Sequence, residues 1–219
     1  MTRLRSEFER LYLARPASPS DAQGRVRALV LEALLPARWE RLSAVWQGVQ
    51  SELELPAPAI AVSGSDGVQL WFSLEAPVAA AQGHAFLDAL RHRWLADLAP
   101  ARLRLLAGNA APVPALLAED RWSAFVAPDL AAVFADTPWL DVEPGEDGQA
   151  ALLQGLRSIG PAAFAQAFAR LRTPARDAPD LAPAISARAD DPRAFLLRVM
   201  NDDRVDLALR IEAAKALLR

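Results

Sequence analysis

The feature that most constrains the fold is a pair of apolar stretches joined by a short turn of small residues. Residues 59–62 and 68–74 flank the sequence Ser-Gly-Ser-Asp-Gly at positions 63–67. In the second stretch apolar positions alternate with polar or aromatic ones: Val68, Leu70, Phe72 and Leu74 against Gln69, Trp71 and Ser73. Because successive side chains of a strand point to opposite faces, this pattern predicts a β-hairpin whose apolar face packs on helices.

Helices are expected on both sides of the hairpin, because apolar residues recur there at three- and four-residue spacing. The predicted helices cover residues 3–14, 21–35, 39–53, 78–98, 149–158 and 161–172. Short strands are predicted over residues 101–106, 123–127 and 139–143, with a helical turn that starts at Pro128 between the last two. The expected fold class is therefore α+β, a mostly helical chain around a small, largely antiparallel sheet.

A change in composition after residue 172 predicts a domain boundary. Residues 173–191 contain three prolines and little apolar periodicity, as is typical of a linker. Beyond them, residues 192–219 are expected to form an amphipathic C-terminal helical hairpin. The predicted organisation is thus an α+β core over residues 1–172, a proline-rich linker and a helical hairpin.

The composition excludes several classes of protein. With 219 residues, 53% of them hydrophobic, the chain can bury one substantial core. A net charge of −3 lacks the basic surplus of proteins that grip duplex DNA, and the absence of cysteine excludes disulfides and thiolate metal sites. No stretch has the length of apolar residues needed for a signal sequence or a bilayer span, so we expect a cytoplasmic protein with no membrane partner. A single lysine among 24 cationic residues is typical of a GC-rich bacterial genome.

The second face of the predicted hairpin is the best candidate for a binding site. It carries Gln69 and Trp71, and Arg102 and Arg104 could share it from a neighbouring strand. A flat indole beside guanidinium groups is a suitable surface for a nucleic-acid base and its phosphate. The alternative is an ordinary sheet face on which a loop or helix covers Trp71.

The stretch VSGSDGVQLWFSLEAPV, residues 62–78, resembles the second motif region of archaeo-eukaryotic primase-type polymerases, including the polymerase domain of bacterial end-joining ligases. In that family a Ser-Gly-rich turn leads into a strand bearing a histidine, then into Pro-Val and a helix. The matching positions are Ser63, Gly64, Gly67, Leu70, Leu74, Pro77 and Val78. The resemblance covers residues 59–98 and implies a primase-palm-like sheet, with Ser63 of the turn among the binding residues.

The chain departs from that family at the residues that carry the chemistry. Gln69 stands where the family has the histidine that contacts the phosphates of the incoming nucleotide, and residues 1–60 contain no Asp-x-Asp or Asp-x-Glu motif. Nucleotidyl transfer with two metal ions needs such paired carboxylates. Asp141 and Glu143 are the remaining metal-ligand candidates, although a plain surface strand explains them more simply. The resemblance therefore implies a degenerate site with no cofactor.

A second resemblance concerns residues 195–219, which are similar to short helical segments of phage-associated proteins, some of them linked to small terminase subunits. Three functional hypotheses follow from the sequence. The first is a non-catalytic protein that binds single-stranded nucleic acid, or a partner that processes it, through Ser63, Gln69, Trp71, Arg102 and Arg104. The alternative is a structural or adaptor protein that acts through its C-terminal hairpin. The third is a divergent nucleotidyltransferase that uses Asp141 and Glu143.

Overall fold

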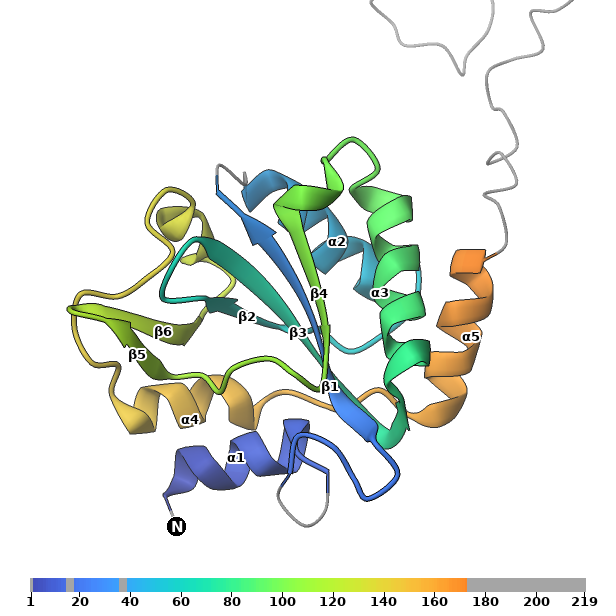
Figure 1. Cartoon of the computed structure of the whole chain (residues 1–219), viewed down its shortest axis with the longest axis horizontal. Helices are drawn as coiled ribbons and strands as arrows, with labels where there is room; N and C mark the ends of the chain where they lie inside the picture. Colours follow the sequence, from blue (N-terminus) through green and yellow to red (C-terminus); the bar gives the residue numbers. More distant parts are fainter. Residues whose placement is uncertain (1, 15–17, 36–38, 173–219) are drawn as a thin grey trace, which may run out of the picture. The chain divides into compact units, whose positions relative to one another are not determined.

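A six-stranded sheet in the order β4-β1-β3-β2-β6-β5 forms the centre of the fold (Figure 1). Every pairing between its neighbouring strands is antiparallel. The strands are β1 (Arg25–Leu34), β2 (Ala59–Val62), β3 (Gly67–Ala79), β4 (Leu103–Ala107), β5 (Ala115–Ala118) and β6 (Arg121–Val126). The helices are α1 (Arg3–Tyr12), α2 (Trp39–Ser51), α3 (Ala80–Trp94), α4 (Glu146–Gln154) and α5 (Pro161–Arg172), with short 3-10 turns η1 (Pro100–Arg102) and η2 (Ala131–Phe134).

The structure is a computed structural model that describes residues 2–14, 18–35 and 39–172. These residues belong to one compact unit, Met1–Pro174. The predicted linker, 173–191, and the predicted helical hairpin, 192–219, lie outside the described residues. Among the helices that the structure describes, none combines the length and the apolar character that crossing a membrane requires.

The central four strands and two of the helices follow the split β-α-β arrangement. Along the chain the order is β1-α2-β2-β3-α3-β4, and in the sheet it is β4-β1-β3-β2. Strands β1 and β2 are therefore parallel to each other with the antiparallel β3 between them, as in ferredoxin-like folds. Helix α1, the β5-β6 hairpin and helices α4 and α5 are additions to this unit.

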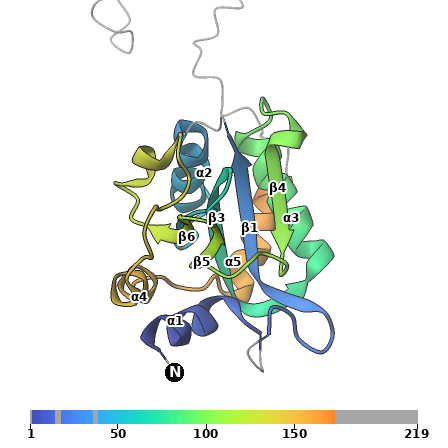
Figure 2. The ribbon, with the colours of Figure 1, turned by 60° about the vertical axis from the view of Figure 1, so that its left-hand side comes forward.

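Helices α2, α3 and α5 cover one face of the sheet and enclose the larger hydrophobic core. The apolar side of the hairpin lies here, as predicted, with Leu70 and Phe72 fully enclosed. Phe86 of α3 packs edge-on against Phe72 and also contacts Phe164 of α5. Figure 2 shows α3 and α4 on opposite sides of the sheet.

Helices α1 and α4 cover the opposite face, where they lie side by side (Figure 1). A second core forms beneath them around Trp71, Tyr12 and Phe125. Two arginines fix the C-terminal end of α1: Arg10 donates to the carbonyl of Leu153, and Arg27 of β1 donates to the carbonyls of Arg10 and Leu13. These bonds satisfy carbonyl groups that a helix end leaves without intrahelical partners.

The α+β fold class and most of the predicted elements are confirmed, but the prediction of a helix over residues 21–35 is wrong. Residues 25–34 form β1, which is bonded to β3 on one side and β4 on the other. Such a central strand is buried on both faces, so its sequence is a nearly continuous run of apolar residues. A run of this kind contains apolar residues at helical spacing and does not distinguish a strand from a helix. The predicted strand over 139–143 is reduced to a single bridge between Leu140 and Trp122, and β5 was not predicted.

The tight turn between β2 and β3 depends on Gly64. Its φ of +79° lies in the left-handed region, and a Cβ added there would meet the backbone nitrogen of Ser123 at 2.7 Å. Gly24 has a similar φ of +70° but open space around the same position. A side chain at either glycine would therefore strain the backbone, but only a side chain at Gly64 would also clash with a neighbouring strand.

We expect Gly64→Ala to lower the free energy of unfolding by about 2 kcal/mol or more, and Gly24→Ala to lower it by only about 1 kcal/mol. Both substitutions place an alanine in the left-handed region, which strains the backbone. Only Gly64→Ala also adds a clash with the backbone of a neighbouring strand. Urea unfolding monitored by tryptophan fluorescence measures both. Equal costs for the two variants would show that the contact with β6 does not restrict the turn.

Candidate functional site

A row of polar side chains crosses three neighbouring strands of the sheet. Glu32 on β1 pairs in register with Arg104 on β4 and with Gln69 on β3. The Arg104 guanidinium lies 3.5 Å from a Glu32 carboxylate oxygen and 3.3 Å from Asp66. Gln69 in turn accepts a 2.8 Å hydrogen bond from the indole N–H of Trp71. The row thus runs from the half-exposed Arg104 to an enclosed tryptophan.

Glu32 is the buried ionisable group of this row, with only 3% of its surface exposed. Burial raises the pKa of the Glu32 carboxyl above its usual range, against the lowering effect of the Arg104 charge and of a hydrogen bond from Gln69. Gly67 leaves room for this carboxylate, because a Cβ there would lie 2.7 Å from a Glu32 oxygen. Sequence analysis missed Glu32 because its strand was predicted as a helix.

The other predicted binding residues have local structural roles. The Ser63 hydroxyl accepts backbone hydrogen bonds from Gly67 at 2.9 Å and Ser65 at 3.2 Å, which holds the turn closed. Arg102 lies in η1, before β4 begins, and donates to the carbonyl of Leu35. Of the two predicted arginines, Arg104 alone joins the row with Gln69.

Trp71 lies in the second core and is 2% exposed. Its ring centroid is 5.1 Å from that of Tyr12 and 5.8 Å from that of Phe8, both on α1, and 5.9 Å from that of Phe125. Of the two interpretations of this face, the structure therefore shows the covered one at Trp71. Stacking of a base on the indole would require α1 to leave the sheet.

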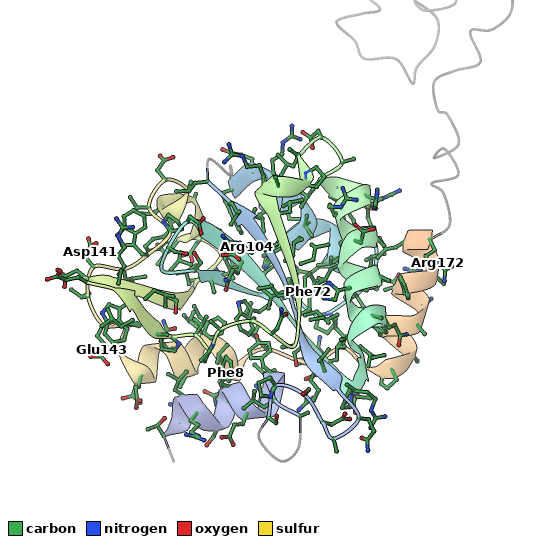
Figure 3. The ribbon with its side chains drawn as sticks, in the orientation of Figure 1. Phe8, Phe72, Arg104, Asp141, Glu143 and Arg172 are labelled. Atoms are coloured by element: carbon green, nitrogen blue, oxygen red, sulfur yellow. The ribbon has the colours of Figure 1, made fainter. Side chains whose placement is uncertain are left out.

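Asp141 and Glu143 lie at one edge of the molecule, away from Arg104 in the view of Figure 3. Asp141 accepts a 3.0 Å hydrogen bond from the indole N–H of Trp139. Within residues 2–14, 18–35 and 39–172, no group of three or more histidine, aspartate or glutamate side chains is arranged to hold a metal ion. The metal-ligand candidates thus have no third acidic partner in the described part of the chain.

A cavity of about 600 Å³, here called the α1 cavity, opens between α1 and the sheet face that bears Trp71. Its lining comes from α1, from the start of β1, from β3 and β6, from the β4-β5 segment, and from the segment that leads into α4. The lining residues are Thr2, Leu4, Arg5, Phe8, Glu9, Tyr12, Leu13, Pro19, Ala28, Trp71, Gly108, Ala110, Pro112, Val113, Pro114, Trp122, Glu143, Pro144 and Glu146. The wall is mainly apolar and aromatic, with carboxylates among its polar groups.

Tyr12 brings a hydroxyl group to this cavity. The residue is 1% exposed, and its hydroxyl makes no hydrogen bond with any described residue. No fully enclosed side-chain oxygen or nitrogen of the described chain lacks a partner, so the Tyr12 oxygen must keep some contact with open space. Because Tyr12 lines the α1 cavity, we infer that its hydroxyl faces this space. Burial raises the pKa of Tyr12 well above its usual range, so the hydroxyl stays neutral.

No protein-family model and no curated protein matches this chain significantly.

A second hollow, of about 810 Å³, lies on the other side of α1, but its charged groups already serve the fold. Arg27 bonds three backbone carbonyl groups, and Arg25 pairs with Asp21 at 2.8 Å. The α1 cavity is the stronger candidate because its wall is mainly apolar and the Tyr12 hydroxyl makes no hydrogen bond with any described residue.

The buried carboxyl of Glu32 predicts a pH-dependent stability. Its folded-state pKa is raised, so the folded protein binds a proton more tightly than the unfolded chain, and stability falls as pH rises from the ordinary glutamate range through the raised value. Glu32→Gln removes this loss. We therefore expect the unfolding free energy of the variant to rise relative to that of the parent as pH increases from the ordinary glutamate range through the raised pKa. Urea unfolding at several pH values measures this difference.

The matched control is Asp129→Asn, which neutralises an exposed carboxylate that makes no ion pair with any described residue. This variant should keep the pH profile of the parent. If the unfolding free energies of Glu32→Gln and of the parent changed with pH in the same way, burial would not raise the pKa of the Glu32 carboxyl.

The unpartnered hydroxyl of Tyr12 predicts that Tyr12→Phe changes the unfolding free energy by less than about 0.5 kcal/mol, because no hydrogen bond is lost. Ser73→Ala is the contrasting variant. The buried Ser73 hydroxyl contacts the carbonyl of Leu11 and the hydroxyl of Ser158, both at 2.6 Å, so its loss should cost about 1–2 kcal/mol. A similar cost in thermal unfolding for Tyr12→Phe would reveal a partner for that hydroxyl.

Proposed function

We propose that this protein is a binding protein that takes a small, largely apolar molecule into the α1 cavity. The observation that carries the proposal is the cavity itself: its volume of about 600 Å³ is in the range of small-molecule sites, and its wall is mainly apolar. Four aromatic residues contribute to that wall, namely Phe8, Tyr12, Trp71 and Trp122. Aromatic side chains offer a large contact area at low cost in conformational entropy.

The surroundings of the cavity favour binding over catalysis. The lining contains no histidine, serine, cysteine or lysine, and of its three glutamates Glu9 is paired with Arg5, while Glu143 and Glu146 are exposed to solvent. Tyr12 supplies a neutral hydroxyl, which can orient a bound molecule by a single hydrogen bond. An apolar wall with a few polar groups is typical of sites that bind small molecules.

Binding of single-stranded nucleic acid stays a prediction from the sequence. Arg104 and Arg102 are exposed and could meet phosphates, but the aromatic surface they would need is covered by α1. The hypothesis of an adaptor that acts through residues 192–219 concerns residues outside the described ranges. The cavity proposal rests on neither.

The test uses phenylnaphthylamine, a neutral apolar dye whose fluorescence rises in apolar surroundings. We expect saturable binding of one dye per chain. Ala110→Phe, which places a ring at the cavity wall, should weaken that binding by about tenfold or more, because the ring occupies part of the space that the dye needs. Fluorescence titration measures both.

The control is Ala132→Phe, which adds the same ring to an exposed position of η2 outside the cavity lining. It should bind the dye as the parent does. The proposal fails if the dye shows no saturable binding, or if both phenylalanine variants bind it equally well.

A further inference from the structure

Charge is unevenly distributed around the mouth of the α1 cavity. The ionisable lining residues, tyrosine aside, are three carboxylates and one guanidinium: Glu9, Glu143, Glu146 and Arg5. Arg5 and Glu9 lie one helical turn apart on α1 and form an ion pair at 2.9 Å, so they neutralise each other. Glu143 and Glu146 form no ion pair with any residue of the described ranges, which leaves two uncompensated negative charges at the cavity.

The fold itself brings these two carboxylates to the cavity. The bridge between Leu140 and Trp122 aligns the segment after η2 with β6, and Gly145 begins α4 as its N-cap. Glu143 and Glu146 stand on either side of that cap. In Figure 3, Glu143 lies at the same edge of the molecule as Asp141. Asp141, however, is bonded to Trp139 and does not line the cavity.

One of the two carboxylates has a purely structural explanation. Glu146 is in the first turn of α4, where a negative charge stabilises the partial positive charge of the helix N-terminus. Glu143 precedes the N-cap and lies outside the helix, so this explanation does not extend to it. Glu143, unlike Glu146, therefore has no such role in the helix.

The interior of the cavity supplies an independent observation. Tyr12 lines the cavity and is almost wholly buried, and its hydroxyl has no partner in the described chain, so this hydroxyl can accept a hydrogen bond from a bound N–H group. The partly exposed rings of Phe8 and Trp122 add to this, because the face of an aromatic ring attracts a cation. The carboxylates and the ring faces favour a cationic ligand, and the Tyr12 hydroxyl is compatible with one because it can accept a hydrogen bond.

We infer that the α1 cavity takes an organic cation, a molecule with an apolar body and an ammonium group that lies between the Tyr12 hydroxyl and the carboxylates of Glu143 and Glu146. This inference rests on the proposed function, since it presupposes that the cavity binds a ligand. It adds that an amine is preferred over a neutral or anionic molecule of the same shape.

The test compares three compounds with the same phenylbutyl body: phenylbutylamine, phenylbutanol and phenylbutyrate. Each displaces phenylnaphthylamine from the protein near neutral pH and at low ionic strength, where surface charges are least screened. We expect the amine to bind about tenfold more tightly than the alcohol, and the carboxylate more weakly than either, because two exposed carboxylates together supply a preference of that order.

The double variant E143Q/E146Q should abolish this preference and leave the affinity for the neutral dye unchanged. Its matched control is D141N/D147N, which removes two charges from the same segment, one of them also in the first turn of α4, at positions that do not line the cavity. The control should keep the preference for the amine. If the dye binds but the three compounds compete equally, or if E143Q/E146Q still prefers the amine, the inference is wrong while the proposed function stands. If the dye does not bind, the proposed function itself fails.

Discussion

The docking of α1 across the sheet is the interaction on which the rest of this face depends. Phe8 and Tyr12 cover Trp71, and the Ser73 hydroxyl donates to the carbonyl of Leu11 near the end of the helix. A row of aromatic contacts, each worth about 1 kcal/mol, therefore acts together with hydrogen bonds to the last turn. Without α1, Trp71 would lie on an open sheet; with it, the same surface becomes the floor of a cavity.

The sequence predicted those parts of the fold whose local pattern allows one interpretation. The hairpin over residues 59–74 was predicted because strict alternation and a glycine-rich turn exclude a helix. Strand β1 was predicted wrongly because burial on both faces removes the alternation, and only pairing with β3 and β4 distinguishes it from a buried helix. That pairing is a long-range property, and a single sequence does not contain it as a local pattern.

The candidate site was still less accessible to sequence analysis. Gln69, Trp71 and Arg104 were singled out, but their relation depends on register across β1, where Glu32 lies between two of them. The α1 cavity draws its wall from segments more than a hundred residues apart, from Phe8 to Glu146. The sequence makes Glu143 a candidate metal ligand, whereas the structure places it on the cavity wall. The type of each of these residues indicates what chemistry it can take part in. Only the folded structure shows which neighbouring residues it contacts.

The split β-α-β unit has a consequence for how such a protein can change over evolution. Its central sheet has two separate hydrophobic cores, one on each face. The core beneath α2, α3 and α5 stabilises the split β-α-β unit. The α1 cavity is built largely from additions to that unit, chiefly α1, the β4-β5 segment and the segment that leads into α4. Mutations in these additions can therefore accumulate with little effect on the packing of the opposite face. The two faces of this small domain are thus free to diverge at different rates.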